Sequence, residues 1–131
     1  MGRHSFDEQR AGLPADVRRT FDRFDAHARS QPGVGMSQLF EGRSYKIRGS
    51  LVARADPKMN SGDGYLGVQF ALEPARLRSR INGRVAEFVR NRPNRPSGGH
   101  PWIFVRGDDP LLDAWLAETF DLACREIGSS S

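Results

Sequence analysis

Arginines gather in one short stretch of this chain, Phe88 to Arg106, which reads FVRNRPNRPSGGHPWIFVR. A guanidinium group is a planar fork of N–H donors that matches phosphate oxygens and the edge of guanine, so this chemistry is anion recognition. Prolines stiffen the loop, which lowers the entropy lost on binding. Ser97-Gly98-Gly99 lets the chain turn back. The candidate nucleic-acid-contacting residues are Arg84, Arg90, Arg92, Arg95, Arg106, His100 and Trp102.

The charge of the 131-residue chain is unevenly distributed, although its net value is only +4. Between Arg76 and Arg106 there are eight arginines and one acid, Glu87, whereas the other 100 residues carry 12 basic and 15 acidic side chains. One basic block on an otherwise acidic chain predicts a surface that faces an anion. The competing interpretation is a solvated basic loop between two strands that has no ligand.

Residue types that catalyse reactions or bind metals are few. The histidines are His4, His27 and His100. No serine stands in a GxSxG or SxxK context, and the acid pair at 108–109 is explained by capping of a helix start. The single cysteine, Cys124, excludes an intramolecular disulfide, and no Cys/His cluster has metal-ligand spacing. We therefore predict a protein that is not an enzyme, with no catalytic residues, no metal and no cofactor.

The glycines at 62, 64 and 67 match the GxGxxG spacing of dinucleotide-binding sites. Such a site needs a strand before the glycines and a helix after them, whereas a strand is expected to follow here, so the match predicts no cofactor. The same stretch resembles the RNP1 signature of RNA-recognition domains at Gly64, Tyr65, Val68 and Phe70. It departs from that signature at Asp63, Leu66 and Gly67, which disfavours an RNA-recognition domain.

Hydrophobic periodicity predicts the elements that hold the basic stretch. Apolar residues at intervals of three or four predict one helix from Pro14 to Gln31 and a longer one over 110–127, with Trp115 in its core stripe. Alternation predicts a strand in which Trp102, Phe104 and Arg106 share one face. The other predicted elements are strands at 36–40, 43–48, 51–55, 66–72 and 85–89 and a short helix at 74–81.

These elements predict a single α+β domain at residues 14–128, between a flexible N-terminal tail at 1–13 and a C-terminal tail at 129–131. The expected order is helix, three strands, helix, two strands, helix, which has one strand fewer before the middle helix than the segments named above. The predicted fold is a single antiparallel sheet with the N- and C-terminal helices packed on one face. The chain starts with polar residues and has no apolar run near the roughly 18 residues of a membrane span, so we predict a cytoplasmic protein with no membrane partner.

The chain also resembles the MmcQ/YjbR family over roughly residues 14 to 127. The family's closing strand, which bears histidine and tryptophan, is similar to Gly98 to Val105. Its acidic turn and aromatic-rich helix are similar to residues 108–127. Residues 40–53 are similar to its early hairpin, although Ser50 stands where the family has lysine, and the loop at 57–64 is longer than usual. The resemblance implies a CyaY-like (frataxin-like) α-β-β-β-α-β-β-α fold and the DNA binding inferred for that family.

Two main functions follow from these observations. The first is a small binding protein whose arginine-rich hairpin loop contacts the phosphates of DNA, with Trp102 and His100 beside that surface. The alternative is a protein that binds or sequesters a small anionic or aromatic metabolite in a pocket beside Trp102 and Tyr65. A third is a protein-interaction module whose basic loop meets an acidic partner. The sequence predicts no oligomeric state.

Overall fold

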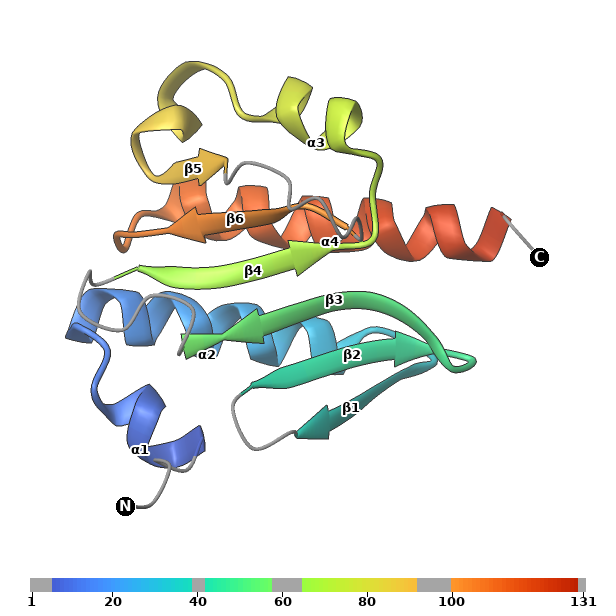
Figure 1. The fold of residues 1–131 in the computed structure, drawn as a ribbon, viewed down its shortest axis with the longest axis horizontal. Coiled ribbons are helices and arrows are strands. Elements are labelled where there is room, and N and C mark those ends of the chain that lie inside the picture. Colours follow the sequence, from blue (N-terminus) through green and yellow to red (C-terminus); the bar gives the residue numbers. More distant parts are fainter. Residues whose placement is uncertain (1–5, 39–41, 58–64, 92–99, 130–131) are drawn as a thin grey trace.

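The structure, a computed structural model, describes residues 6–38, 42–57, 65–91 and 100–129 (Figure 1). The helices of this part of the chain are α1 (Phe6–Ala11), α2 (Ala15–Ser30), α3 (Pro74–Arg80) and α4 (Pro110–Ser129), together with the 3-10 helix η2 (Gly83–Glu87). The strands are β1 (Val34–Gln38), β2 (Arg43–Ile47), β3 (Ser50–Asp56), β4 (Leu66–Phe70), β5 (Val89–Asn91) and β6 (Trp102–Val105).

The strands form one antiparallel sheet in the order β1-β2-β3-β4-β6-β5. The tight turn Arg48-Gly49 joins β2 to β3, and both residues have positive φ, 52° and 81°, as two-residue hairpins require. The spatial order of β5 and β6 is the reverse of their chain order, so β6 pairs with β4, with Ile103 opposite Val68. As a result β6 is an interior strand, with a neighbour on each side.

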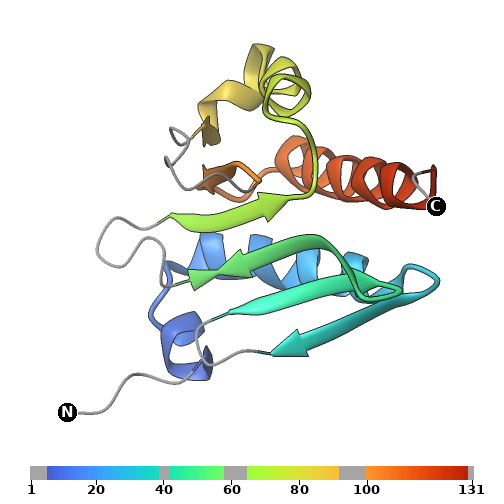
Figure 2. The same cartoon turned by 45° about the vertical axis from the view of Figure 1, so that its right-hand side comes forward.

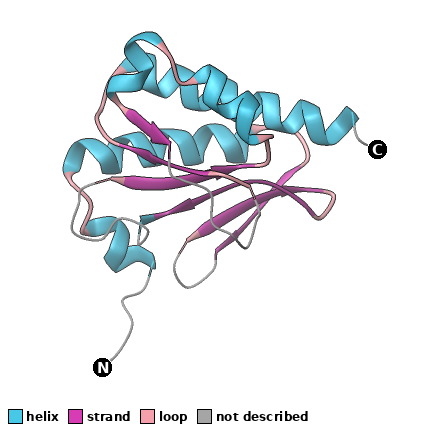
Figure 3. Cartoon of the chain, turned by 45° about the horizontal axis from the view of Figure 1, so that its top comes forward, coloured by secondary structure: helices cyan, strands magenta, loops and turns pink. Residues whose placement is uncertain are grey.

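The helices α2 and α4 run across the same face of the sheet (Figures 2 and 3). Phe24 of α2 lies at the centre of the core between them. Its ring centroid is 5.7 Å from that of Tyr45, 6.0 Å from that of Phe70 and 5.8 Å from that of Phe120, each nearly perpendicular. Edge-to-face contact is the favourable geometry for such rings. These contacts join both helices to β2 and β4.

The predicted α+β class, with one antiparallel sheet and terminal helices on one face, is confirmed. The predicted helices correspond to α2, α3 and α4 within one or two residues at each end. Trp115 is buried as expected, and its indole N–H donates to the carbonyl of Arg80 at 2.9 Å. The predicted order of three strands before the middle helix is wrong, because β1, β2, β3 and β4 all precede α3.

Two boundaries also differ from those predicted. Residues 6–11, placed in a flexible tail, form α1, because Phe6 is an apolar anchor that packs 5.6 Å from the ring of Phe21. The strand predicted at 85–89 is replaced by η2 and then β5, because Val85 turns inward and the Phe88 N–H donates to its carbonyl at 2.9 Å. Arg90, predicted in a loop, is consequently a strand residue.

Ion pairs fasten α2 to the start and middle of α4. Arg19 donates to Asp108 at 2.8 Å, Arg23 pairs with both Asp108 and Asp113, and His27 lies 2.8 Å from Asp121. The two acids predicted to cap the helix therefore have different roles. Asp109 accepts from the Leu111 N–H at 2.8 Å, as a capping residue does, whereas Asp108 binds arginines of α2. The basic groups of Arg19 and Arg23 are thus neutralised within the fold.

A buried carboxylate, Asp25, organises the junction of α2 with β2. One of its oxygens accepts from the Tyr45 hydroxyl at 2.6 Å and the other from Arg43 at 2.7 Å, while the Arg43 guanidinium lies 4.7 Å from the centre of the Phe6 ring. Burial, reinforced by the bond to Asp25, raises the pKa of Tyr45 above its ordinary value. The phenol therefore remains a hydrogen-bond donor at neutral pH. Apolar spacing along α2 does not predict the burial of Asp25, because its side chain is polar.

Candidate nucleic-acid interface

The sheet has a second face, opposite α2 and α4, which we call the open face. Along β6, Ile103 and Val105 are fully buried, whereas Trp102 and Phe104 are half-buried. Successive side chains of a strand point to opposite faces, so Trp102, Phe104 and the following Arg106 belong to the open face. This confirms the face that alternation predicts for these three residues.

Cross-strand pairing extends the open face across the sheet. Arg54 of β3 lies opposite Gln69 of β4, which lies opposite Trp102 of β6. The Arg54 guanidinium carbon is 5.7 Å from the Trp102 ring centroid, within cation–π range. Gln69 between them donates to the carbonyl of His100 at 2.9 Å, which fixes the chain just before β6.

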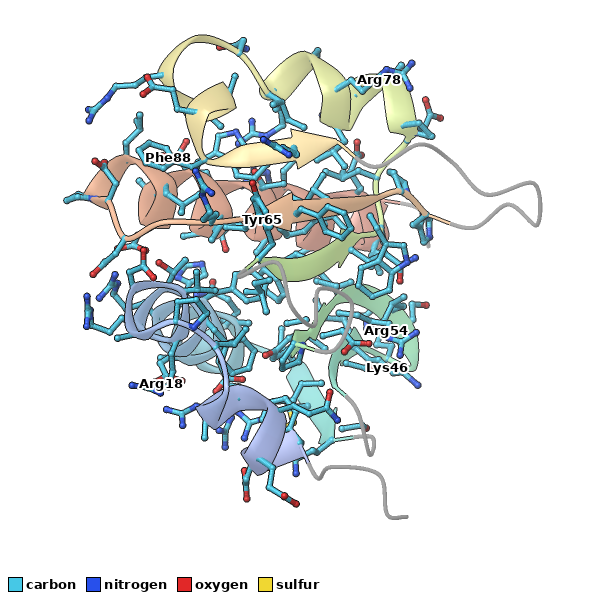
Figure 4. All side chains as sticks on the ribbon, turned by 60° about the vertical axis from the view of Figure 1, so that its left-hand side comes forward. Arg18, Lys46, Arg54, Tyr65, Arg78 and Phe88 are labelled. Atoms are coloured by element: carbon cyan, nitrogen blue, oxygen red, sulfur yellow. The ribbon has the colours of Figure 1, made fainter. Side chains whose placement is uncertain are left out.

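A second group on this face surrounds Tyr65, which directly precedes β4. Arg90 of β5 pairs with Phe104 of β6, and the Phe104 ring lies 6.2 Å from that of Tyr65. The guanidinium carbon of Arg90 is 5.3 Å from the Tyr65 ring centroid, and that of Arg106 is 5.2 Å away. Two cations and two aromatic rings, from β5, from β6 and from the residues next to β4 and β6, thus meet at one place. Figure 4 labels Tyr65 near β6.

Four cations reach the open face from different strands: Lys46 of β2, Arg54 of β3, Arg90 of β5 and Arg106 at the end of β6. Figure 4 labels Lys46 and Arg54, which come from adjacent strands. None of the four forms an ion pair with any residue that the structure describes. Their charge is therefore not neutralised by the rest of the described chain.

The structure brings together three of the predicted site residues, Arg90, Arg106 and Trp102, and locates two others elsewhere. Arg84 lies on η2 and donates to Asp109 at 3.2 Å. His100 is exposed and contributes its carbonyl to Gln69. Arg92 and Arg95 lie outside the described residues.

Other arginines of the basic block serve the fold. Arg76 of α3 pairs with Glu126 of α4. The Arg80 guanidinium donates to Thr119 at 3.1 Å and lies 5.8 Å from the Trp115 ring centroid. The block is therefore split between structural and exposed arginines, which the count of charges does not reveal.

Sequence reasoning missed Lys46 and Arg54 as members of this face. Both are single basic residues outside the basic block, and their strands were treated only as framework. The alternation that predicts the faces of β6 also indicates the face of Arg54, since Arg54 stands between the buried residues Ala53 and Ala55. That pattern places Arg54 on the face opposite the helices.

Two cavities of about 530 and 650 Å³ lie near the far end of α4 and share His100, Ala71 and Glu126 in their walls. Neither is lined by Trp102 or Tyr65, so neither is the pocket of the predicted metabolite site. Among the described residues, no group of three or more His, Cys, Asp or Glu side chains is arranged to hold a metal ion. In the same part of the chain, no helix has the length and apolar character needed to span a membrane.

Comparison with protein families, with curated proteins and with solved structures finds no match to this chain.

Proposed function

We propose that this protein is a non-enzymatic nucleic-acid-binding protein that holds phosphates against the open face of its sheet. The observation that carries the proposal is the convergence of Lys46, Arg54, Arg90 and Arg106 on that face without ion-pair partners among the described residues. Unpaired cations on a rigid surface attract a polyanion and release its counterions on binding. Arg19 and Arg23 of α2 are less suited to this role, because Asp108 and Asp113 already bind them.

DNA is the partner that the sequence predicts, and the resemblance to the MmcQ/YjbR family supports it. Arg92 and Arg95 lie outside the described residues, but they follow Arg90 closely in the chain. We include both as further phosphate contacts for that reason. Alanine at both positions should weaken DNA binding about threefold or more at low salt, since each contact contributes electrostatic free energy.

Two charge-matched double variants test the proposal. Arg90→Ala/Arg106→Ala removes two cations from the open face, whereas Arg18→Ala/Arg78→Ala removes two from α2 and α3, which Figure 4 shows apart from Tyr65. Affinity for a labelled DNA oligonucleotide is measured by fluorescence anisotropy over a range of salt. The first variant should bind about tenfold more weakly, with a log–log salt slope reduced by about 1.4 to 1.8. Equal losses in the two variants would refute the role of the open face.

The alternative ligand, a small anionic or aromatic metabolite, would give a different result in a titration that follows tryptophan emission. A compact ligand contacts few charges, so its binding should quench tryptophan emission with little dependence on salt. Saturable, salt-insensitive quenching by a mononucleotide or an aromatic acid, with no binding of DNA, would replace the proposal.

A further inference from the structure

Two groups of aromatic side chains lie on opposite faces of the sheet in the described part of the chain. On the helix-covered face, Tyr45, Phe21, Phe70 and Phe120 are fully buried. On the open face, Trp102, Phe104 and Tyr65 are only half-buried. Large apolar rings held on a charged and accessible face mark a surface that another molecule can cover.

Guanidinium groups lie over two rings of this aromatic surface, those of Trp102 and Tyr65. Arg54 lies 5.7 Å from the Trp102 ring centroid, and Arg90 and Arg106 lie 5.3 and 5.2 Å from that of Tyr65. A nucleobase that stacks on either ring takes the place of a guanidinium group over it and leaves that group close to the adjoining phosphate. Alternate residues of a strand are about 7 Å apart, so Trp102 and Phe104 offer two separate stacking positions along β6.

The width of the open face indicates which form of nucleic acid fits. From β2 to β5 the sheet spans four strand intervals, or about 19 Å. The major groove of B-DNA is only about 12 Å wide and admits a helix or a two-stranded ribbon. This face therefore cannot enter the groove, and a duplex would hide its bases from the aromatic rings. A single strand can lie flat on the sheet and expose every base to stacking.

We propose that the ligand is single-stranded nucleic acid, whose bases stack on Trp102 and on the Tyr65–Phe104 pair while its phosphates meet Arg54, Arg90 and Arg106. This inference rests on the proposed function and narrows it to a class of substrate. The shared chemistry is an unpaired base with an adjoining phosphate, which single-stranded DNA and RNA both supply.

The test compares three labelled ligands of equal length, oligothymidylate, oligouridylate and a blunt DNA duplex, with the full chain at low salt. Either single strand should bind at least about tenfold more tightly than the duplex, because stacking adds to the phosphate contacts. The two single strands differ in the sugar and in the 5-methyl group of the base. A preference for either over the other supports the inference as long as both bind more tightly than the duplex.

Paired substitutions separate stacking from structural support. Trp102→Phe and Tyr65→Phe keep a π face and should bind within about threefold of wild type, whereas Trp102→Leu and Tyr65→Leu should lose about tenfold. Circular dichroism verifies that all four variants fold. Binding should also quench wild-type tryptophan emission, and Trp102→Phe should abolish the quenching, since Trp115 is buried.

The outcomes separate the two proposals. Binding of the duplex as tightly as the single strands, or equal affinities of the Phe and Leu variants, would overturn the stacking inference and leave nucleic-acid binding in place. No binding of any of the three ligands would overturn both.

Discussion

Arg54 and Trp102 meet across an intervening strand: the guanidinium carbon of Arg54 on β3 lies 5.7 Å from the ring centroid of Trp102 on β6. A partly exposed cation–π contact contributes about 1 kcal/mol or less, so Arg54→Ala should change the free energy of unfolding little. If Arg54 contacts a phosphate, the log–log salt slope for a single strand should fall by about 0.7. Arg78→Ala is the control, because it removes an exposed arginine of α3. A slope unchanged in Arg54→Ala would exclude Arg54 from the binding surface.

The buried carboxylate of Asp25 should be one of the most sensitive positions in the fold. Asp25→Ala leaves the Tyr45 hydroxyl and the Arg43 guanidinium without their partner and should lower the free energy of unfolding by about 3 kcal/mol. Tyr45→Phe, which removes one hydrogen bond, should cost about 1 kcal/mol. Urea denaturation measures both.

Asp22→Ala provides the matched control, because Asp22 lies on the same helix and pairs with Arg10 at the half-exposed surface. An exposed pair of this kind should cost less than about 1 kcal/mol to remove. The importance of the buried network would be contradicted if Asp22→Ala and Asp25→Ala destabilised the protein equally.

Acid should weaken the attachment of α4 to α2 through Asp108. Hydrogen bonds from Arg19 and Arg23 hold the pKa of this carboxyl below its ordinary value near 3.8. The folded protein therefore binds this proton more weakly than the unfolded chain does. The charged group stabilises the fold above the unfolded-state pKa, and this contribution is lost as pH falls through the lower folded-state pKa. Asp108→Asn should lower Tm at about pH 7, and the difference from wild type should shrink toward about pH 2.

Asp113 is the internal comparison, because the net shift of its pKa has the opposite sign. Burial raises the pKa of Asp113 despite its contact with Arg23, so the folded protein binds this proton more tightly than the unfolded chain does. Asp113→Asn should therefore lower Tm at neutral pH by less than Asp108→Asn does. A Tm deficit of Asp108→Asn that is constant across the acid range would contradict this account.

Cys124 should react slowly with thiol reagents. Its burial, followed by the nearby charge of Asp121, raises the pKa of the thiol to about 11. Only the thiolate reacts, so at about pH 8 the folded protein should be labelled by a disulfide reagent more than about a hundredfold more slowly than an unfolded cysteine. The same protein in concentrated urea gives the reference rate. Similar rates in both conditions would show that the thiol is accessible and ionised.

Local patterns predicted the parts of this fold that depend on local physics. Apolar spacing located α2 and α4, and alternation along β6 correctly put Trp102 and Arg106 on one face. Proline and glycine near the ends of α2 marked its limits, because proline lacks the N–H that a helix interior requires.

Long-range relationships were not predictable in this way. Asp25 has a polar side chain that suits an outer helical face, and its shortest bonds, which make its burial tolerable, come from the distant residues Arg43 and Tyr45. Likewise, alternation does not specify strand order. The position of β6 beside β4, which brings Trp102 within reach of Arg54, follows from packing of the whole sheet.

The most direct test of the central claim is a salt titration of the wild-type protein with a labelled single-stranded oligonucleotide, followed by fluorescence anisotropy. If Lys46, Arg54, Arg90 and Arg106 each meet a phosphate together with Arg92 and Arg95, log affinity should fall against log salt with a slope near about −4. Binding that is absent at low ionic strength, or that does not change with salt, would contradict the claim that this face recognises nucleic acid.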